Sequence, residues 1–290
     1  MTARPTTAVT LVVAGLVCQE GGAALAVQLF PHTGPLGMVM LRLFFSAVIL
    51  LLLTRPRWRG HSRGAWVAVA RFGAVLAAMN GLFYLALERL PLGVTVTIEV
   101  LGPLVLSIVV SRRRSAWLWA ALALAGVVAL GGGGWGRLDL LGVVFALGAA
   151  ATWALYILAS ARVGALFTGL DGLALAMAIG AALSLPFGIA NAGSALFRID
   201  LVALGAAVAL LSSTIPYALE LLALRRLPAS AFAILMSLAP ATAALAGFVL
   251  LSQHLSWLET VGIGLVVLAS IGAVRAAGPR APAADVPPPA

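Results

Sequence analysis

The amino-acid sequence predicts an all-α integral membrane protein with ten transmembrane helices, arranged as two inverted five-helix repeats with both termini in the cytoplasm. Three observations support this prediction: the composition, the recurrence of long apolar runs, and a segment of the first half that returns in the second. Of the 290 residues, 62% are hydrophobic and 9% are charged, and the mean hydropathy is +1.11. Soluble globular proteins have about 25% charged residues. The whole chain is therefore expected to lie in a bilayer.

The expected helices follow from the apolar runs, because a bilayer core requires about 20 apolar residues per helix. These runs lack the ten-residue alternation of a membrane β-barrel. Loop signals such as PHTGP and GGGGWGR separate them. They predict helices at about 7–30, 35–54, 65–88, 91–111, 115–132, 139–160, 171–190, 199–222, 228–251 and 256–275. Residues 276–290, rich in proline and alanine, predict a disordered cytoplasmic tail.

The arginines predict the orientation. All 18 basic residues are arginine, and with the N-terminus inside, 13 of them fall on cytoplasmic segments and three on outside loops. Cytoplasmic loops carry an excess of basic residues, so both termini are expected inside. The arginines are spread over short loops and form no basic domain, which excludes nucleic acid as a partner.

An internal repeat divides the chain into 1–137 and 138–275. Residues 86–104 and 223–241 are identical at 7 of 19 positions at an offset of 137, and their prolines coincide. The offset relates the fourth helix to the ninth, so each half has five helices. An odd number of helices makes the second half enter the membrane from the opposite face. Inverted repeats are a common architecture of transporters, with the substrate site near the midplane.

Glu99 raises the main question about chemistry, because it lies in the middle of the fourth predicted helix. Pro103 has no N–H and crowds the carbonyl of Glu99. We expect helix breaks at Gly102 and Pro103 and, in the second half, at Pro240. A charged side chain at the bilayer centre costs about 2.5–3.5 kcal/mol. Glu99 is therefore expected to face a cavity, a partner or a proton, unless it is protonated and satisfied by a neighbouring helix.

Other polar and aromatic side chains at similar depth are candidate substrate-binding residues. Each also has a structural interpretation, such as an ion pair or snorkelling for the arginine, a surface ion pair with Arg225 for Glu220, and packing for the aromatic residues. The candidates besides Glu99 are Gln19, Glu20, Arg42, Asn80, Tyr217, Glu220, Trp153 and Tyr156.

The sequence carries no enzyme signature. It has no H-E-x-x-H or G-x-S-x-G motif, and its three histidines fall in or near loops without the spacing of metal ligands. The glycines at 131–134 are not followed by Lys-Ser/Thr, so they are not a phosphate-binding loop. We expect neither catalysis nor a metal or other cofactor.

Several segments together resemble a known family. LERLPLGVTVTIEVLGPLVLSIVVSRR, MNGLFYL at 79–85, STIPYALELLALRRLP at 213–228 and the LRLFF around Arg42 resemble the EamA-type branch of the drug/metabolite transporter superfamily, and within it the threonine/homoserine exporters. The resemblance implies ten helices in two inverted repeats, the bacterial inner membrane, and proton-driven efflux of small amino acids or related metabolites. It places Glu99, Arg42, Asn80, Tyr217 and Glu220 near the pathway.

Three departures from the family pattern concern charge. Ala239 precedes Pro240, whereas members of this family have a motif similar to M-S-x-E-P in the ninth helix. Gln253 stands where many members of the family have an acid. Glu20 stands where the exporters have a small polar residue. These differences suggest that a charge has moved from the ninth helix to the first.

The expected mechanism is proton antiport with alternating access. Glu99 or Glu20 would take the ammonium of an amino acid and exchange a proton, because a carboxyl group in low dielectric binds a proton more readily than in water. Arg42, Asn80 and Tyr217 would take its carboxylate. The expected partners are this small-molecule substrate, protons and the lipid bilayer, and a homodimer is compatible with them. The alternatives are a carrier of other metabolites or amphipathic drugs, and a non-transporting membrane scaffold.

Overall fold

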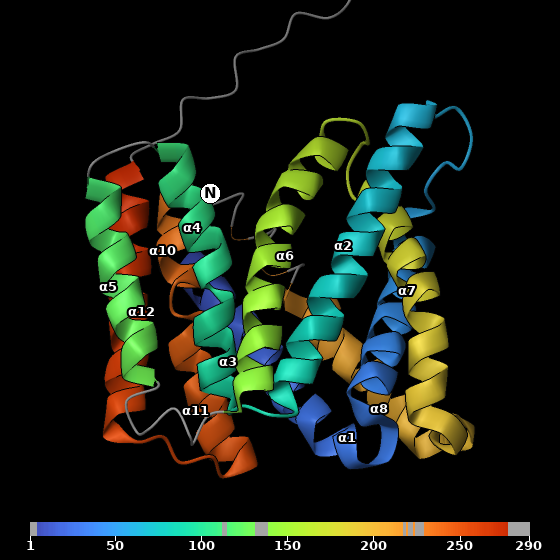
Figure 1. Cartoon of the computed structure of the whole chain (residues 1–290). Helices are drawn as coiled ribbons and strands as arrows, with labels where there is room; N and C mark the ends of the chain where they lie inside the picture. Colours follow the sequence, from blue (N-terminus) through green and yellow to red (C-terminus); the bar gives the residue numbers. More distant parts are fainter. Residues whose placement is uncertain are drawn as a thin grey trace, which may run out of the picture.

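The computed structural model describes the following residues: 5–111, 115–130, 139–216, 219, 223 and 229–277. Within them all regular secondary structure is helical (Figure 1). The helices are α1 (Pro5–Thr54), α2 (Arg63–Leu87), α3 (Leu92–Glu99), α4 (Leu101–Ser111), α5 (Ser115–Leu130), α6 (Leu140–Gly164), α7 (Asp171–Ala192), η1 (Gly193–Phe197), α8 (Ile199–Ala209), η2 (Leu210–Thr214), α10 (Ala229–Met236), α11 (Ala239–Leu251) and α12 (Trp257–Ala277).

Six of these helices are long and apolar enough to cross a membrane, and three further apolar helices have 10–17 residues. Large apolar side chains such as Leu124, Phe187 and Val249 are exposed. An exposed apolar surface of this extent is what a lipid bilayer covers. The chain is therefore an all-helical integral membrane protein.

The helix α1 combines the first two predicted helices across a kink. Gly34 has φ 65° and ψ 164°, which is outside the helical region and is accessible to glycine without strain. The amide oxygen of Asn191 in α7 accepts hydrogen bonds from the N–H groups of Leu36 (3.0 Å) and Gly37 (3.4 Å). It satisfies two donors at the start of the second half of α1. The sharp bend is visible at the lower edge of Figure 1.

Two helices are broken in the middle, and the breaks have the same position in each half. The bounds of α10 are those of α3 displaced by 137 residues, and α4 and α11 follow after one and two residues. Each break lies just before a proline, Pro103 or Pro240, whose missing N–H and bulky ring disrupt the bond to the fourth residue before it. The helices thus break at Val100 and at residues 237–238, two or three residues before the prolines at which the breaks were predicted, Pro103 and Pro240.

Gly102 lies inside α4 and does not itself end a helix. A Cβ atom there would collide with the carbonyl oxygen of Ala150 in α6. The glycine therefore serves close packing of α4 on α6, as small residues commonly do between membrane helices.

Contacts between helices also recur at the offset of 137 residues. The helix α6 packs against α2 and α4, and α1 packs against α8 and α11. By residue number α6 corresponds to the first half of α1, α2 to α8, and α4 to α11. The broken helix of each half is thereby held against the first helix of the other half.

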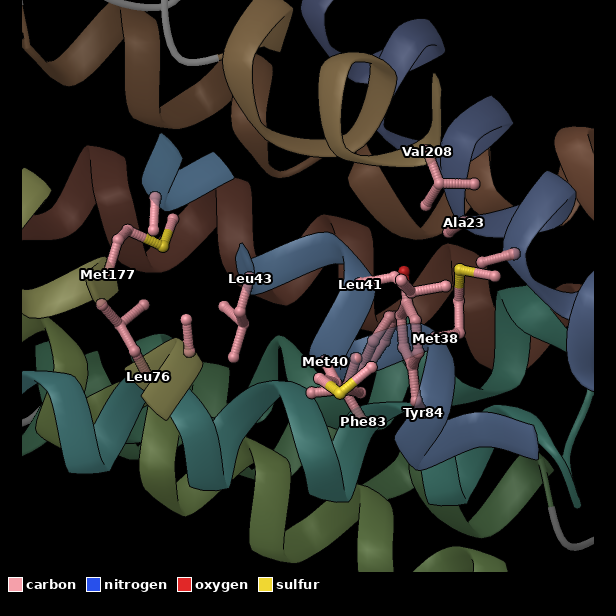
Figure 2. Packing of buried hydrophobic residues seen from close by; sticks show 14 of the residues in the cluster. Ala23, Met38, Met40, Leu41, Leu43, Leu76, Phe83, Tyr84, Met177 and Val208 are labelled. Carbon is pink, nitrogen blue, oxygen red and sulfur yellow. The ribbon is translucent and has the colours of Figure 1, made fainter. Parts of the chain in front are cut away.

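The core between α1, α2 and α7 holds these helices close together. Figure 2 shows Leu43, Leu76 and Met177 meeting between the three helices, with Phe83 and Tyr84 further along α2. A Cβ atom on Gly73 would lie 2.7 Å from the carbonyl oxygen of Ala176, so α2 and α7 touch backbone to backbone. Two of these helices, α1 and α2, also line the cavity described next.

Candidate functional site

A cavity of about 160 Å³ lies among α1, α2, α3, α6, α10 and α11. An apolar cavity of about 150 Å³ accommodates benzene, whereas sites for drug-sized ligands measure about 300–1,000 Å³. The volume therefore fits a small metabolite. The described residues that line it are Gln19, Glu20, Ala23, Arg42, Met79, Asn80, Phe83, Val96, Glu99, Trp153, Tyr156, Met236 and Ala239.

Most residues singled out from the sequence meet at this cavity. Of the nine candidates, the structure brings seven to its wall: Gln19, Glu20, Arg42, Asn80, Glu99, Trp153 and Tyr156. The other two, Tyr217 and Glu220, lie outside the described residues. The sequence did not indicate the apolar lining residues Phe83, Val96 and Met236.

The two broken helices end at the cavity. Glu99 is the last residue of α3 and Met236 is the last residue of α10, and both line the wall. In an unbroken helix their carbonyl groups would accept hydrogen bonds from residues 103 and 240, but these are prolines. Each break therefore leaves a backbone acceptor beside the cavity.

The cavity contains two acidic side chains and one basic one among its described lining residues. Glu20 is only 2% exposed, and the Gln19 side chain hydrogen-bonds to it. The charges of Glu99 and Arg42 both act on Glu20, and Arg42 also acts on Glu99. A buried charge requires a partner, a hydrogen bond or neutralisation. With both acids ionised, these three side chains leave one negative charge in excess.

Three hydrogen bonds of Arg42 go to neutral groups on two other helices. Its Nε donates to the hydroxyl of Ser213 (3.2 Å) and its Nη2 to the carbonyl of Ser212 (3.1 Å). Its Nη1 donates to the hydroxyl of Tyr84 (3.3 Å), and its guanidinium carbon lies 5.6 Å from the centroid of that ring. These contacts hold Arg42 inside the helix bundle, so it is not a snorkelling side chain.

Asn80 and the two aromatic residues of α6 complete the polar part of the wall. The amide nitrogen of Asn80 donates to the carbonyl of Leu76 (2.8 Å), which leaves the amide oxygen as the acceptor of this side chain. Trp153 and Tyr156 are three residues apart, on one face of α6. The Tyr156 ring packs on Phe72 with 5.3 Å between centroids. Tyr156 therefore has the predicted packing role as well as a place in the wall.

A second cavity of about 130 Å³ is also lined by Tyr156 and extends to the connection between α6 and α7. Tyr156 and Ser160 lie one turn apart on α6 and continue the face that lines the central cavity. Tyr156 thus lines both cavities. The second is lined by Phe72, Tyr156, Ser160, Val163, Gly164, Phe167, Gly169, Gly172 and Leu173.

Comparison with known proteins identifies the family. A model of the EamA-like transporter family matches residues 140–275. The threonine/homoserine exporter RhtA of Escherichia coli (strain K12) is 38% identical over 267 residues, which cover 91% of this chain and 90% of that protein. The chain belongs to the EamA-like transporter family. RhtA of Salmonella typhimurium (strain SL1344) is likewise 38% identical, over 87% of this chain and 86% of its own length.

A solved crystal structure supports the same fold for this EamA-like transporter. It is 19% identical in sequence, has a TM-score of 0.65, and the match covers 94% of this chain and 98% of that chain. The family and the curated exporters, not this structure, show that the protein is a multi-pass bacterial membrane exporter with a small-molecule substrate. The cavity described above lies inside its helix bundle.

One departure from the family pattern has a structural explanation. The amide oxygen of Gln253, just after α11, accepts a hydrogen bond from the N–H of Leu92 at the start of α3 (2.9 Å). This bond satisfies a donor that the helix itself leaves unpaired. A carboxylate oxygen could accept the same bond, so an acid at this position is not required for a chemical role. In this EamA-like transporter Gln253 joins the two broken helices.

Among the described residues, no group of three or more histidine, cysteine, aspartate or glutamate side chains could hold a metal ion. Ala239 lines the cavity beside Pro240. The family resemblance led to the expectation of an acid at this position. The second acid of the cavity is instead Glu20.

Proposed function

We propose that the protein exports small zwitterionic amino acids, threonine and homoserine among them, across the bacterial inner membrane in exchange for protons. The observation that carries this proposal is the charge arrangement around the central cavity: Glu20, Glu99 and Arg42 share a space of about 160 Å³. An amino acid presents one ammonium and one carboxylate, so it requires both signs of charge. The curated relatives are named as threonine/homoserine exporters, which supports this substrate class.

Substrate binding uses groups from several helices. Glu99 or Glu20 pairs with the ammonium, and Arg42 pairs with the carboxylate, assisted by Asn80 and Tyr217. Hydrogen bonds to charged groups contribute about 1.5–3 kcal/mol each. Trp153 and Tyr156 line the space for the side chain of the substrate, and its volume disfavours amphipathic drugs.

Proton coupling follows from the second acid. With both acids ionised, the three charged lining residues carry one negative charge in excess, and one proton removes it. A proton on Glu99 or Glu20 and the ammonium of a substrate compete for the same carboxylate. Since only one of them is bound at a time, the protein exchanges them across the membrane.

Alternating access is proposed to arise from two inverted repeats, 1–137 and 138–275, with ten transmembrane helices in total. With both termini and the tail 276–290 in the cytoplasm, the second cavity faces the cytoplasm at the connection between α6 and α7. The substrate enters there, passes Tyr156 and reaches Glu99. A homodimer remains compatible with this route.

The test is counterflow in proteoliposomes. Vesicles that contain the purified protein and are loaded with unlabelled threonine are expected to accumulate labelled threonine and homoserine. In a separate measurement, an inward proton gradient is expected to drive uphill efflux of threonine from loaded vesicles. Empty vesicles and labelled glucose serve as controls. Counterflow of a drug-sized amphipathic cation in place of amino acids would assign the alternative carrier function. The scaffold alternative would be favoured by two results together: no tested solute is transported, and cells with Glu99→Ala have the same phenotype as cells with the wild type.

A further inference from the structure

The segment η2 is a π-helix of residues Leu210–Thr214. The N–H of Ile215 bonds to the carbonyl of Leu210, five residues earlier. Such turns are rare, occur as single-turn bulges and are frequent at functional sites. In this protein the widened turn contacts α1, which carries Glu20 and Arg42.

Pro216 explains the widened turn. In a regular α-helix the carbonyl of Ser212 would accept a hydrogen bond from residue 216. Proline has no N–H, and its ring crowds that carbonyl. The Ser212 carbonyl instead accepts a hydrogen bond from Nη2 of Arg42 at 3.1 Å. The proline thereby creates an acceptor in the helix, and the arginine uses it.

The packing around the turn is close. Ser212 and Ser213 are each 2% exposed. A Cβ atom on Gly22 of α1 would collide with the hydroxyl of Ser212 and would lie 3.0 Å from Cβ of Leu211. The glycine therefore permits the contact that brings α1 against the turn.

Three N–H groups of Arg42 bond to the protein at fixed points. Ser212 and Ser213 take Nη2 and Nε, and the fully buried Tyr84 takes Nη1 through its hydroxyl. Arginine has five N–H donors in a rigid planar fork. Because three of them fix the plane, the direction in which the others point is also fixed.

We propose that η2 and Tyr84 form a cradle that orients Arg42 towards the substrate carboxylate, with Ser213 and Tyr84 as positioning residues. This inference rests on the proposed function, because it takes Arg42 to bind a carboxylate. A planar guanidinium held in place binds a carboxylate with less loss of side-chain freedom than a mobile one. Pro216 and Gly22 are then required for the shape of the cradle.

The experiment measures threonine affinity by isothermal titration calorimetry, together with the melting temperature of the ligand-free protein. Ser213→Ala and Tyr84→Phe are each expected to weaken threonine binding about tenfold, since each removes a hydrogen bond to a charged group. The melting temperature is expected to stay close to that of the wild type. The matched control is Ser212→Ala, because Arg42 uses the carbonyl of this residue, and its hydroxyl has no hydrogen-bond partner among the described residues.

The outcomes separate the inference from the function beneath it. If wild-type protein binds neither threonine nor homoserine, the proposed function fails and the inference fails with it. If the wild type binds but Ser213→Ala and Tyr84→Phe bind equally well, the cradle is overturned while the function stands. An equal loss in Ser212→Ala, or a loss accompanied by a fall in melting temperature, would also overturn it, because the serines would then act on packing. If one variant fails to fold, the other decides.

Discussion

The two broken helices stop at corresponding positions and carry different side chains there. In both α3–α4 and α10–α11 the helix stops four residues before a proline, and the last residue before the break lines the central cavity. That residue is Glu99 in the first half and Met236 in the second. The helix break therefore occurs in both halves, whereas a charged residue precedes it only in the first half. The carboxylate requires the cavity, but the cavity does not require a carboxylate at each break.

A third proline shows how a broken hydrogen-bond ladder is used. Pro216 leaves the Ser212 carbonyl to Arg42, which lies 170 residues away in the sequence. Here a backbone acceptor holds a cation, while at α3 an acidic side chain stands at the same kind of break. Ser212 and Ser213 of the second half, together with Tyr84 of the first, thus hold the positive charge of the cavity. The first half supplies both negative charges and the arginine itself.

The largest effect is expected when Glu99 loses its charge. Glu99→Gln should reduce proton-driven threonine exchange roughly ten- to a hundredfold, because hydrogen bonds to charged groups are worth about 1.5–3 kcal/mol. The measurement is exchange in proteoliposomes with and without a pH gradient. The control is Glu88→Gln, which makes the same chemical change at an exposed acid at the end of α2. Full gradient-driven exchange in Glu99→Gln would remove this residue from proton coupling.

The next prediction tests whether the position of the second acid matters. Glu20→Gln should lower gradient-driven exchange about tenfold by removing one charged contact. Adding Ala239→Glu, which puts an acid back on the same cavity wall beside Pro240, is expected to restore a large part of the activity. Ala239→Glu alone is the control. If the double variant transports no better than Glu20→Gln, the two positions are not equivalent and the charge has not simply moved between helices.

The sequence predicted the polar half of the site and not its apolar half. Glu20, Arg42 and Asn80 stood out because a polar side chain in an apolar run is costly unless it has a partner. Phe83 and Met236 gave no such signal, because one apolar residue among many in a membrane helix is uninformative about which way it faces.

The repeat and the breaks were also accessible from the sequence, since paired prolines at a fixed offset have a local effect on the backbone. The π-helix was not. A proline at 216 disturbs the turn before it, but which way the turn relaxes depends on Gly22 and Arg42, which come from a distant part of the chain. Close approach at Gly102 likewise depends on Ala150, so a glycine beside a proline was interpreted as part of the break.

A smaller effect is expected from repairing the breaks. Pro103→Ala restores an N–H that can bond to the Glu99 carbonyl, which should turn the carboxylate away from the cavity and slow exchange roughly fivefold, or by about 1 kcal/mol. Pro240→Ala makes the same repair where no acid precedes the break, and it should slow exchange less. The melting temperature of both variants should be equal to or above that of the wild type. Equal losses of transport would show that the shape of the break, and not Glu99, is what matters.

The smallest effect concerns the anchor at the start of α3. Arg89, two residues before Pro91, forms an ion pair with Asp139 (2.9 Å), and Asp139 also accepts hydrogen bonds from the N–H groups of Leu141 and Gly142 at the start of α6. The hydrogen bond from Gly142, followed by that from Arg89, holds the pKa of Asp139 below its usual value of 3.8.

Because the pKa of Asp139 is lowered by folding, its stabilising effect is complete above about pH 3.8 and is lost as the pH falls through the lowered value. Asp139→Asn keeps a capping oxygen but loses the ion pair, so its melting temperature should be about 1–3 °C below that of the wild type at pH 6. The difference should shrink as the pH approaches 3, as measured by thermal unfolding in detergent, and exchange at pH 7 should be unchanged. If the difference in melting temperature between the variant and the wild type stays constant down to pH 3, the ion pair is not what holds the start of α3. The anchor would then be Gln253, which belongs to the other half.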